Sequence, residues 1–118
     1  MNPSHDFRLL MVLSGLWALP GVAQTDAAAR DRLVLESRSD GKCQNLSEGG
    51  KLVVLKSLDG ERAITYKLVR YFADVPQSTP VGRISPDTPE QPLGCNRVDG
   101  RPQRWEIRNA SFEERDKP

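Results

Sequence analysis

The chain has few of the side chains that most often perform catalysis or bind transition metals. Its single histidine, His5, lies near the N-terminus, and its only cysteines are Cys43 and Cys95. Without a histidine in the rest of the chain, there is no Ser-His-Asp or Cys-His arrangement. A zinc or copper site would have to combine carboxylates with the two cysteines. We therefore expect no catalytic residue, no metal site and no cofactor.

Paired carboxylates are the one catalytic device that remains, as in the hydrolysis of a cell-wall glycan. The eligible residues before the C-terminal tail are Asp74, Asp87, Glu90, Asp99 and Glu106. A catalytic acid needs partial burial to raise its pKa, and most of these residues stand beside proline or glycine in predicted loops. Gly49 and Gly50 lack the Gly-Lys-Ser/Thr continuation of a phosphate loop. The sequence thus predicts that the protein is not an enzyme.

The N-terminus has the pattern of an export signal. Residues 1–8 are mostly polar with one arginine, and residues 9–19 form an uncharged apolar run that is too short to span a bilayer. Gly21 and Ala23 provide the small-x-small pattern that signal peptidases accept. The alternative is a core helix, which a chain this short can barely surround. We predict that residues 1–23 are a signal peptide that is removed, and that the protein is periplasmic or secreted.

Export places the two cysteines in an oxidising compartment. Cys43 and Cys95 are therefore expected to form one disulfide, worth about 4 kcal/mol in the chain-entropy model. The alternative is a reactive thiol or redox pair, but such pairs are usually close in sequence. The disulfide would be a large part of the stability of so small a domain.

The charge of the chain argues against a polyanionic partner. Lysine and arginine number 17, and aspartate and glutamate number 16. Duplex DNA and anionic membrane surfaces usually require a clear basic excess. We expect neither a nucleic acid nor a membrane span, and a protein of the cell envelope as the partner.

The pattern of apolar residues predicts strands separated by turns. Strands are expected over residues 33–37, 51–58, 63–72, 81–84, 93–98 and 104–110. Residues 85–92 are the expected exposed loop, because prolines punctuate them. The predicted domain covers residues 33–112, after a flexible lead (24–32) that adds little to the core and before a charged tail (113–118).

Short strands with turn signals about every ten residues and one long-range disulfide are typical of an all-β fold. We expect a small antiparallel immunoglobulin-like β-sandwich of about six or seven strands. The antibody pattern itself is absent, because Trp105 follows the second cysteine instead of lying between the two. Leu93 also stands where a tyrosine corner needs tyrosine.

A cluster of arginines near the C-terminus is the candidate binding surface. If Trp105 points inward, the strand must point Arg104 and Arg108 outward, and Arg97 and Arg101 lie just upstream. Arginine is enriched at protein interfaces. The alternative is a solvated sheet face with a cross-strand ion pair.

The sequence therefore predicts a protein that works by binding. It would recognise another envelope or secreted protein as an inhibitor, an immunity-type neutraliser or an accessory subunit. The proline-rich loops between residues 73 and 92 would present part of the binding surface, because fixed backbone angles lower the cost of ordering. The alternative is a cell-wall carbohydrate-binding module or a small carboxylate-based glycan hydrolase.

Overall fold

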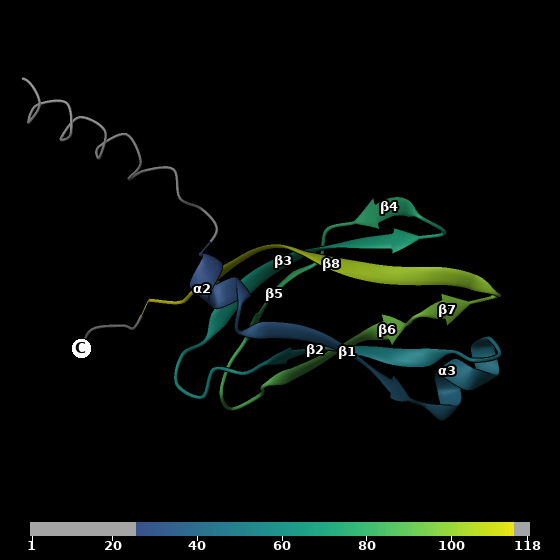
Figure 1. Cartoon of the computed structure of the whole chain (residues 1–118), viewed down its shortest axis with the longest axis horizontal. Coiled ribbons are helices and arrows are strands. Elements are labelled where there is room, and N and C mark those ends of the chain that lie inside the picture. The colour runs from purple at the N-terminus through teal and green to yellow at the C-terminus, as the bar shows by residue number, and fades with distance from the viewer. Residues whose placement is uncertain (1–25, 115–118) are drawn as a thin grey trace, which may run out of the picture.

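The computed structural model describes residues 26–114 and contains two antiparallel sheets (Figure 1). The three-stranded sheet has the order β1-β2-β6 and is formed by β1 (Leu33–Ser39), β2 (Lys51–Ser57) and β6 (Glu90–Cys95). The five-stranded sheet has the order β4-β3-β8-β7, and β5 also pairs with β3. Its strands are β3 (Ile64–Phe72), β4 (Val75–Ser78), β5 (Val81–Ile84), β7 (Arg97–Val98) and β8 (Arg101–Phe112). The all-β prediction is confirmed.

One hydrophobic core contains residues from both sheets. The three-stranded sheet contributes Leu33, Val53 and Leu55. The five-stranded sheet contributes Ile64, Tyr66, Leu68, Ile84, Trp105 and Ala110. In β3, the alternate residues Ile64, Tyr66 and Leu68 face this core, as the pleat of a strand requires. The inward position predicted for Trp105 is confirmed, since 7% of this residue is exposed.

A short helix before β1 adds to the core, whereas the sequence analysis expects this segment to contribute little to it. Helix α2 (Ala27–Arg30) begins at Asp26, whose carboxylate accepts hydrogen bonds from the N–H groups of Ala28 and Ala29. The N–H of Asp26 donates to the C=O of Ala110 on β8 at 2.8 Å. Ala29 is completely buried because its small side chain fits against this strand. The expectation that residues 24–32 add little to the core is therefore wrong for Ala29, and residues 24 and 25 lie outside the described residues.

A second short helix holds the disulfide. The sequence reads Ser39, Asp40 and Gly41 as a turn, whereas Asp40 caps helix α3 (Gly41–Leu46) through the N–H groups of Lys42 and Cys43. Cys43 is bonded to Cys95 at the end of β6, with 5.3 Å between the Cα atoms. The predicted disulfide is confirmed, and it ties α3 to the three-stranded sheet.

Several strand boundaries differ from the predictions. The predicted strand 93–98 is divided between β6 and β7, which belong to different sheets, and β4 lies in a segment where no strand was expected. Strands β1 and β8 are longer than the predicted 33–37 and 104–110. The expected loop of residues 85–92 is shorter, because β6 already begins at Glu90 and pairs with β2. The predicted tail begins with an ordered residue, since Glu113 forms an ion pair with Arg83 at 2.9 Å. Residues 115–118 and the predicted signal peptide (1–23) lie outside the described residues.

Candidate functional site

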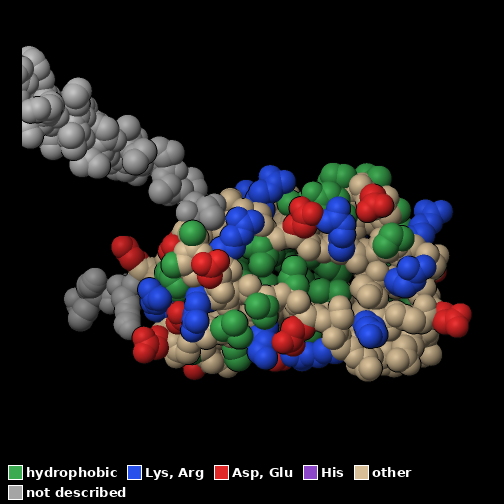
Figure 2. All heavy atoms as spheres, in the orientation of Figure 1, with side chains coloured by type: hydrophobic (Ala, Val, Ile, Leu, Met, Phe, Trp, Pro, Cys, Tyr) green, Lys and Arg blue, Asp and Glu red, His purple; other side chains and the backbone are tan. Residues whose placement is uncertain are grey.

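A cleft of about 460 Å³ opens where the edge strands β5 and β6 of the two sheets come close together. We call it the seam cleft. It is lined by Tyr66, Arg70, Pro80, Val81, Gly82, Arg83, Gln91, Pro92, Leu93 and Trp105. Figure 2 shows the general setting, in which hydrophobic side chains gather in the middle of the visible face and charged side chains lie around them. Most of the lining belongs to the proline-rich stretch after Phe72.

Two aromatic side chains line the seam cleft from the core, and each is matched by a glycine. Tyr66 on β3 and Trp105 on β8 are 9% and 7% exposed. A Cβ atom on Gly82 would lie 2.4 Å from the hydroxyl oxygen of Tyr66. A Cβ atom on Gly94 would lie 3.1 Å from the Trp105 ring. Both strands can therefore approach the aromatic rings only because they carry glycine at these positions.

The rim of the seam cleft at β5 has an open backbone edge. The N–H of Leu68 donates to the C=O of Pro80, and Lys67 is the register partner of Val81. In an antiparallel ladder this makes Lys67 and Val81 a non-hydrogen-bonded pair. The backbone N–H and C=O groups of Val81 and Arg83 therefore point away from β3. Val81 is also 68% exposed, the largest value among the exposed large hydrophobic residues of the described chain.

The opposite rim, at β6, carries a proline that lacks a main-chain hydrogen-bond donor. The N–H of Ser57 donates to the C=O of Pro89, and Lys56 is the register partner of Glu90. The same ladder argument makes Val54 and Pro92 a non-hydrogen-bonded pair. The ring nitrogen of Pro92, which has no hydrogen, therefore faces the free edge. Proline at such a position protects an edge strand without breaking the sheet.

The lining of the seam cleft includes two arginines and no aspartate or glutamate. Arg83 has an ion-pair partner, Glu113. Arg70 lies opposite Trp105 in the sheet register and is half-buried. Its guanidinium donates to the Gln103 side chain at 2.7 Å and to the Ser78 hydroxyl at 3.3 Å. No carboxylate of the described chain forms an ion pair with it.

The predicted arginine surface is partly occupied by internal contacts. Arg104 points outward from β8 and donates to the Glu106 carboxylate at 2.5 Å. Its guanidinium also lies 4.1 Å from the ring centre of Tyr71 and 3.8 Å from a carboxylate oxygen of Asp74. The hydrogen bond from Arg104 lowers the pKa of Glu106, and Glu106 raises the pKa of Arg104. The ion pair with Glu106 lies within β8, and the contact across to β3 is the one with the Tyr71 ring, so Arg104 is held by internal contacts of the sheet face.

The other three predicted arginines differ in their exposure and in their internal contacts. The Arg97 side chain on β7 donates to the C=O of Gly100 at 2.7 Å, within its own turn. Arg101 is the exposed first residue of β8. Arg108 is exposed and sits at a register shift between β3 and β8. None of these four arginines lines the seam cleft.

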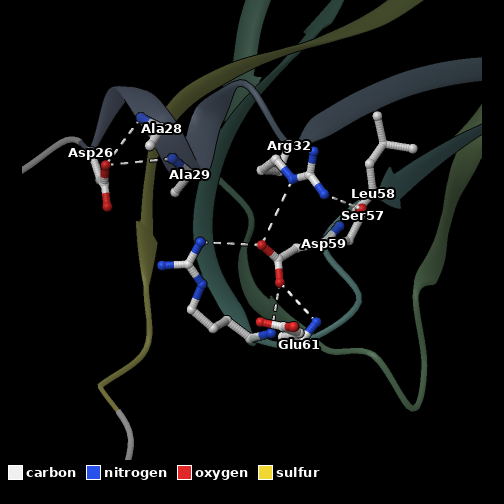
Figure 3. Close-up of polar contacts among 9 residues, drawn as sticks. Asp26, Ala28, Ala29, Arg32, Ser57, Leu58, Asp59 and Glu61 are labelled. Carbon is white, nitrogen blue, oxygen red and sulfur yellow. Dashed lines mark hydrogen bonds and ion pairs between the residues drawn. The ribbon is translucent and has the colours of Figure 1, made fainter.

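A polar cluster around Asp59 is a structural feature of the turn between β2 and β3 (Figure 3). One carboxylate oxygen of Asp59 accepts from the N–H groups of Glu61 and Arg62 at 2.9 and 2.7 Å, and these bonds lower its pKa. The other oxygen lies 3.7 Å from Arg32 and 3.4 Å from the Arg62 guanidinium. Its charge is therefore fully matched, which is the environment of a turn-forming carboxylate and not of a catalytic acid.

A larger groove of about 660 Å³ is dominated by charged residues that pair with one another. Arg83 and Glu113 form a two-pronged hydrogen bond across it, at 3.0 and 2.9 Å. Arg62 stacks on the Phe112 ring at 3.5 Å. The outer face of the three-stranded sheet is closed in a similar way, by the ion pair that joins Arg38 of β1 to Glu90 of β6. Neither surface presents both an apolar patch and an unmatched charge.

The sequence analysis identified the segment that lines the seam cleft but not the cleft. Fixed proline angles direct attention to residues 73–92, whereas the inward position predicted for Trp105 gives it a role in the core only. The glycines at 82 and 94, inside predicted strands, were the available signal, because an internal strand glycine often marks the close approach of another group.

No family model matches the chain, and neither the curated proteins nor the solved structures contain a match. Within residues 26–114, no group of three or more histidine, cysteine or acidic side chains is placed to hold a metal ion. In the same range, no helix has the length and apolar character needed to cross a membrane.

Proposed function

We propose that this protein is an exported, non-enzymatic binding protein that takes an extended segment of another protein into the seam cleft. The two antiparallel sheets, the shared core and the single disulfide support an immunoglobulin-like β-sandwich as the scaffold. The Cys43–Cys95 disulfide also supports an oxidising compartment, such as the periplasm or the cell exterior.

The open edge of β5 beside an aromatic-lined cleft is the observation that carries this proposal. An extended peptide can add to a sheet edge through main-chain hydrogen bonds, while pockets beside the edge select its side chains. The free N–H and C=O groups of Val81 and Arg83 provide the first element. Tyr66 and Trp105 provide the second. Val81 then changes from an exposed apolar side chain into one that is buried on binding.

A glycan ligand has weaker support from the same site. Sugars bind best to aromatic rings with an exposed face. Tyr66 and Trp105 are almost completely buried, and the backbones of Gly82 and Gly94 lie against them. The cleft therefore offers no open stacking platform for a sugar ring.

The proposal is tested with two exposed valines of the same sheet. The full chain is used to select binders from a random peptide display library, and the affinity of a selected peptide is measured by fluorescence anisotropy. Val81→Ser removes apolar contact at the rim, worth about 1–2 kcal/mol, so the peptide should bind roughly 5- to 30-fold more weakly. Val75→Ser is the matched control, because Val75 is 53% exposed on β4 and does not line the cleft.

Two outcomes would contradict the proposal. If soluble cell-wall glycan binds and no peptide can be selected, the carbohydrate alternative gains support. If peptides bind and Arg104→Glu together with Arg108→Glu abolishes binding while Val81→Ser does not, the arginine surface of β8 is the site.

A further inference from the structure

We infer that the segment bound in the seam cleft carries a carboxylate that pairs with Arg70, next to an apolar side chain that packs on Tyr66 and Trp105. This inference rests on the proposed function, which it makes more specific. It specifies a chemical group of the ligand and the protein residue that binds this group.

The first argument is the unusual position of the Arg70 charge. Arg70 lies on the core side of β3, directly opposite Trp105 in the register. Removing a guanidinium from water carries a desolvation cost that a paired carboxylate can offset, and Arg70 is half-buried. In the described chain, the neutral side chains of Gln103 and Ser78 are its only hydrogen-bond partners. Its positive charge is therefore unmatched until a ligand arrives.

The second argument is that Arg70 is held in place. The Gln103 side chain accepts from Arg70 at 2.7 Å and donates its own N–H to the C=O of Cys95 at 2.7 Å. Cys95 is in turn fixed by the disulfide to Cys43. The guanidinium is therefore anchored to both sheets. A pre-positioned arginine loses little side-chain entropy when it binds a carboxylate, and its planar fork suits the two oxygens.

The third argument is the sign of the charge around the seam cleft. The lining has no acidic residue, whereas acidic residues line two other cavities: Asp59 and Glu61 line one, and Glu61, Asp87, Glu113 and Glu114 line the other. The nearest acidic residue of β6 in sequence, Glu90, is bound to Arg38 at 2.7 Å. A carboxylate that enters the cleft would meet attraction and no like charge. Asp or Glu beside an apolar residue therefore fits the site.

The experiment is a double-mutant cycle between protein and peptide. Peptides selected on the full chain are expected to share an acidic residue beside an apolar one. Replacing that acidic residue by its amide should weaken binding to the wild-type protein roughly tenfold. The same replacement should have almost no effect on binding to Arg70→Gln, since the partner charge is gone. Peptides with a free or an amidated C-terminus distinguish a side-chain carboxylate from a terminal one.

Arg101→Gln is the matched control, because Arg101 is an exposed arginine that does not line the cleft. The amide peptide should show the same roughly tenfold loss with this variant. Arg70→Lys, which keeps the charge, should retain part of the coupling. It also serves as the test variant if thermal melting shows that Arg70→Gln is unfolded.

The results separate this inference from the proposed function. Selected peptides without acidic residues, or an equal loss in wild type and Arg70→Gln, would overturn the carboxylate even where Val81→Ser still weakens binding. Binding that ignores Val81→Ser, or the failure to select any peptide, would overturn the seam cleft as the peptide site and this inference with it.

Discussion

Replacing Gly82 by alanine tests the geometry on which the seam cleft depends. The new Cβ atom would lie 2.4 Å from the hydroxyl oxygen of Tyr66 and 2.7 Å from the ring carbon that bears it. Ordinary van der Waals contacts are about 1 Å longer, so the ring or the strand must move. Tyr66 is only 9% exposed and packs in the core, which limits its movement. Overpacking of this kind lowers the free energy of unfolding by about 1–3 kcal/mol.

The assay is thermal unfolding followed by circular dichroism. For a domain of this size, a loss of about 1–3 kcal/mol lowers the melting temperature by roughly 5–20 °C. Tyr66→Phe removes the closest atom, so the double variant should recover part of the loss as a positive coupling. Gly60→Ala is the control, since no atom lies within 4 Å of its Cβ position and its φ is not positive. It should change stability by less than about 0.5 kcal/mol.

The reasoning fails if Gly82→Ala is as stable as the wild type. It also fails if the loss is unchanged when Tyr66 is replaced by phenylalanine. Alanine is otherwise favoured over glycine in a strand by about 0.5–1 kcal/mol, so a destabilised variant cannot be explained by backbone entropy. Such a loss would have to come from the contact between β5 and Tyr66.

Two further predictions concern stability. Replacing Cys43 and Cys95 by alanine should lower the free energy of unfolding by about 4 kcal/mol, because the disulfide closes a loop between residues 52 positions apart. Denaturant titration measures this loss. A loss below about 1 kcal/mol would contradict a stabilising role of the disulfide. Asp59 has a lowered pKa in the folded state, so its carboxylate stabilises the fold above its ordinary pKa, and this contribution is lost as the pH falls through the lowered value. Asp59→Asn should therefore be less stable at neutral pH and show a shallower loss on acidification, and equal pH profiles of the two proteins would contradict this.

The strands that the sequence predicts well are those with a clear alternation of apolar residues. Residues 63–72 and 104–110 correspond to β3 and β8, which pair along most of their length. Their core side chains, such as Leu68 and Trp105, follow from the period of two alone. The disulfide is predictable because the chain has only two cysteines, which can form only one pair in the expected oxidising compartment.

The two short helices were not predictable from periodicity. Helices α2 and α3 have four and six residues, which is too short for a helical repeat of apolar positions. Each depends on one aspartate cap, Asp26 or Asp40, and on one small buried side chain, Ala29 or Cys43. For α3, Asp40 before Gly41 predicts a turn equally well. Tertiary contacts favour the helices: α2 packs on β8, and α3 contacts β2 and β7 and is joined to β6 by the disulfide.

The seam cleft was not predictable because it depends on which strands become the edges of the two sheets. Two prolines near the same segment have opposite effects, and the phase of the ladder explains why. Pro92 places its missing donor on the free edge of β6, so that edge resists pairing. Pro80 contributes its C=O to β3 and leaves the next residue, Val81, with its own N–H and C=O on the free edge of β5. A shift of one residue in either strand would exchange these roles, which is why the composition of this segment does not reveal its free edge and only the register shows which backbone groups lie there.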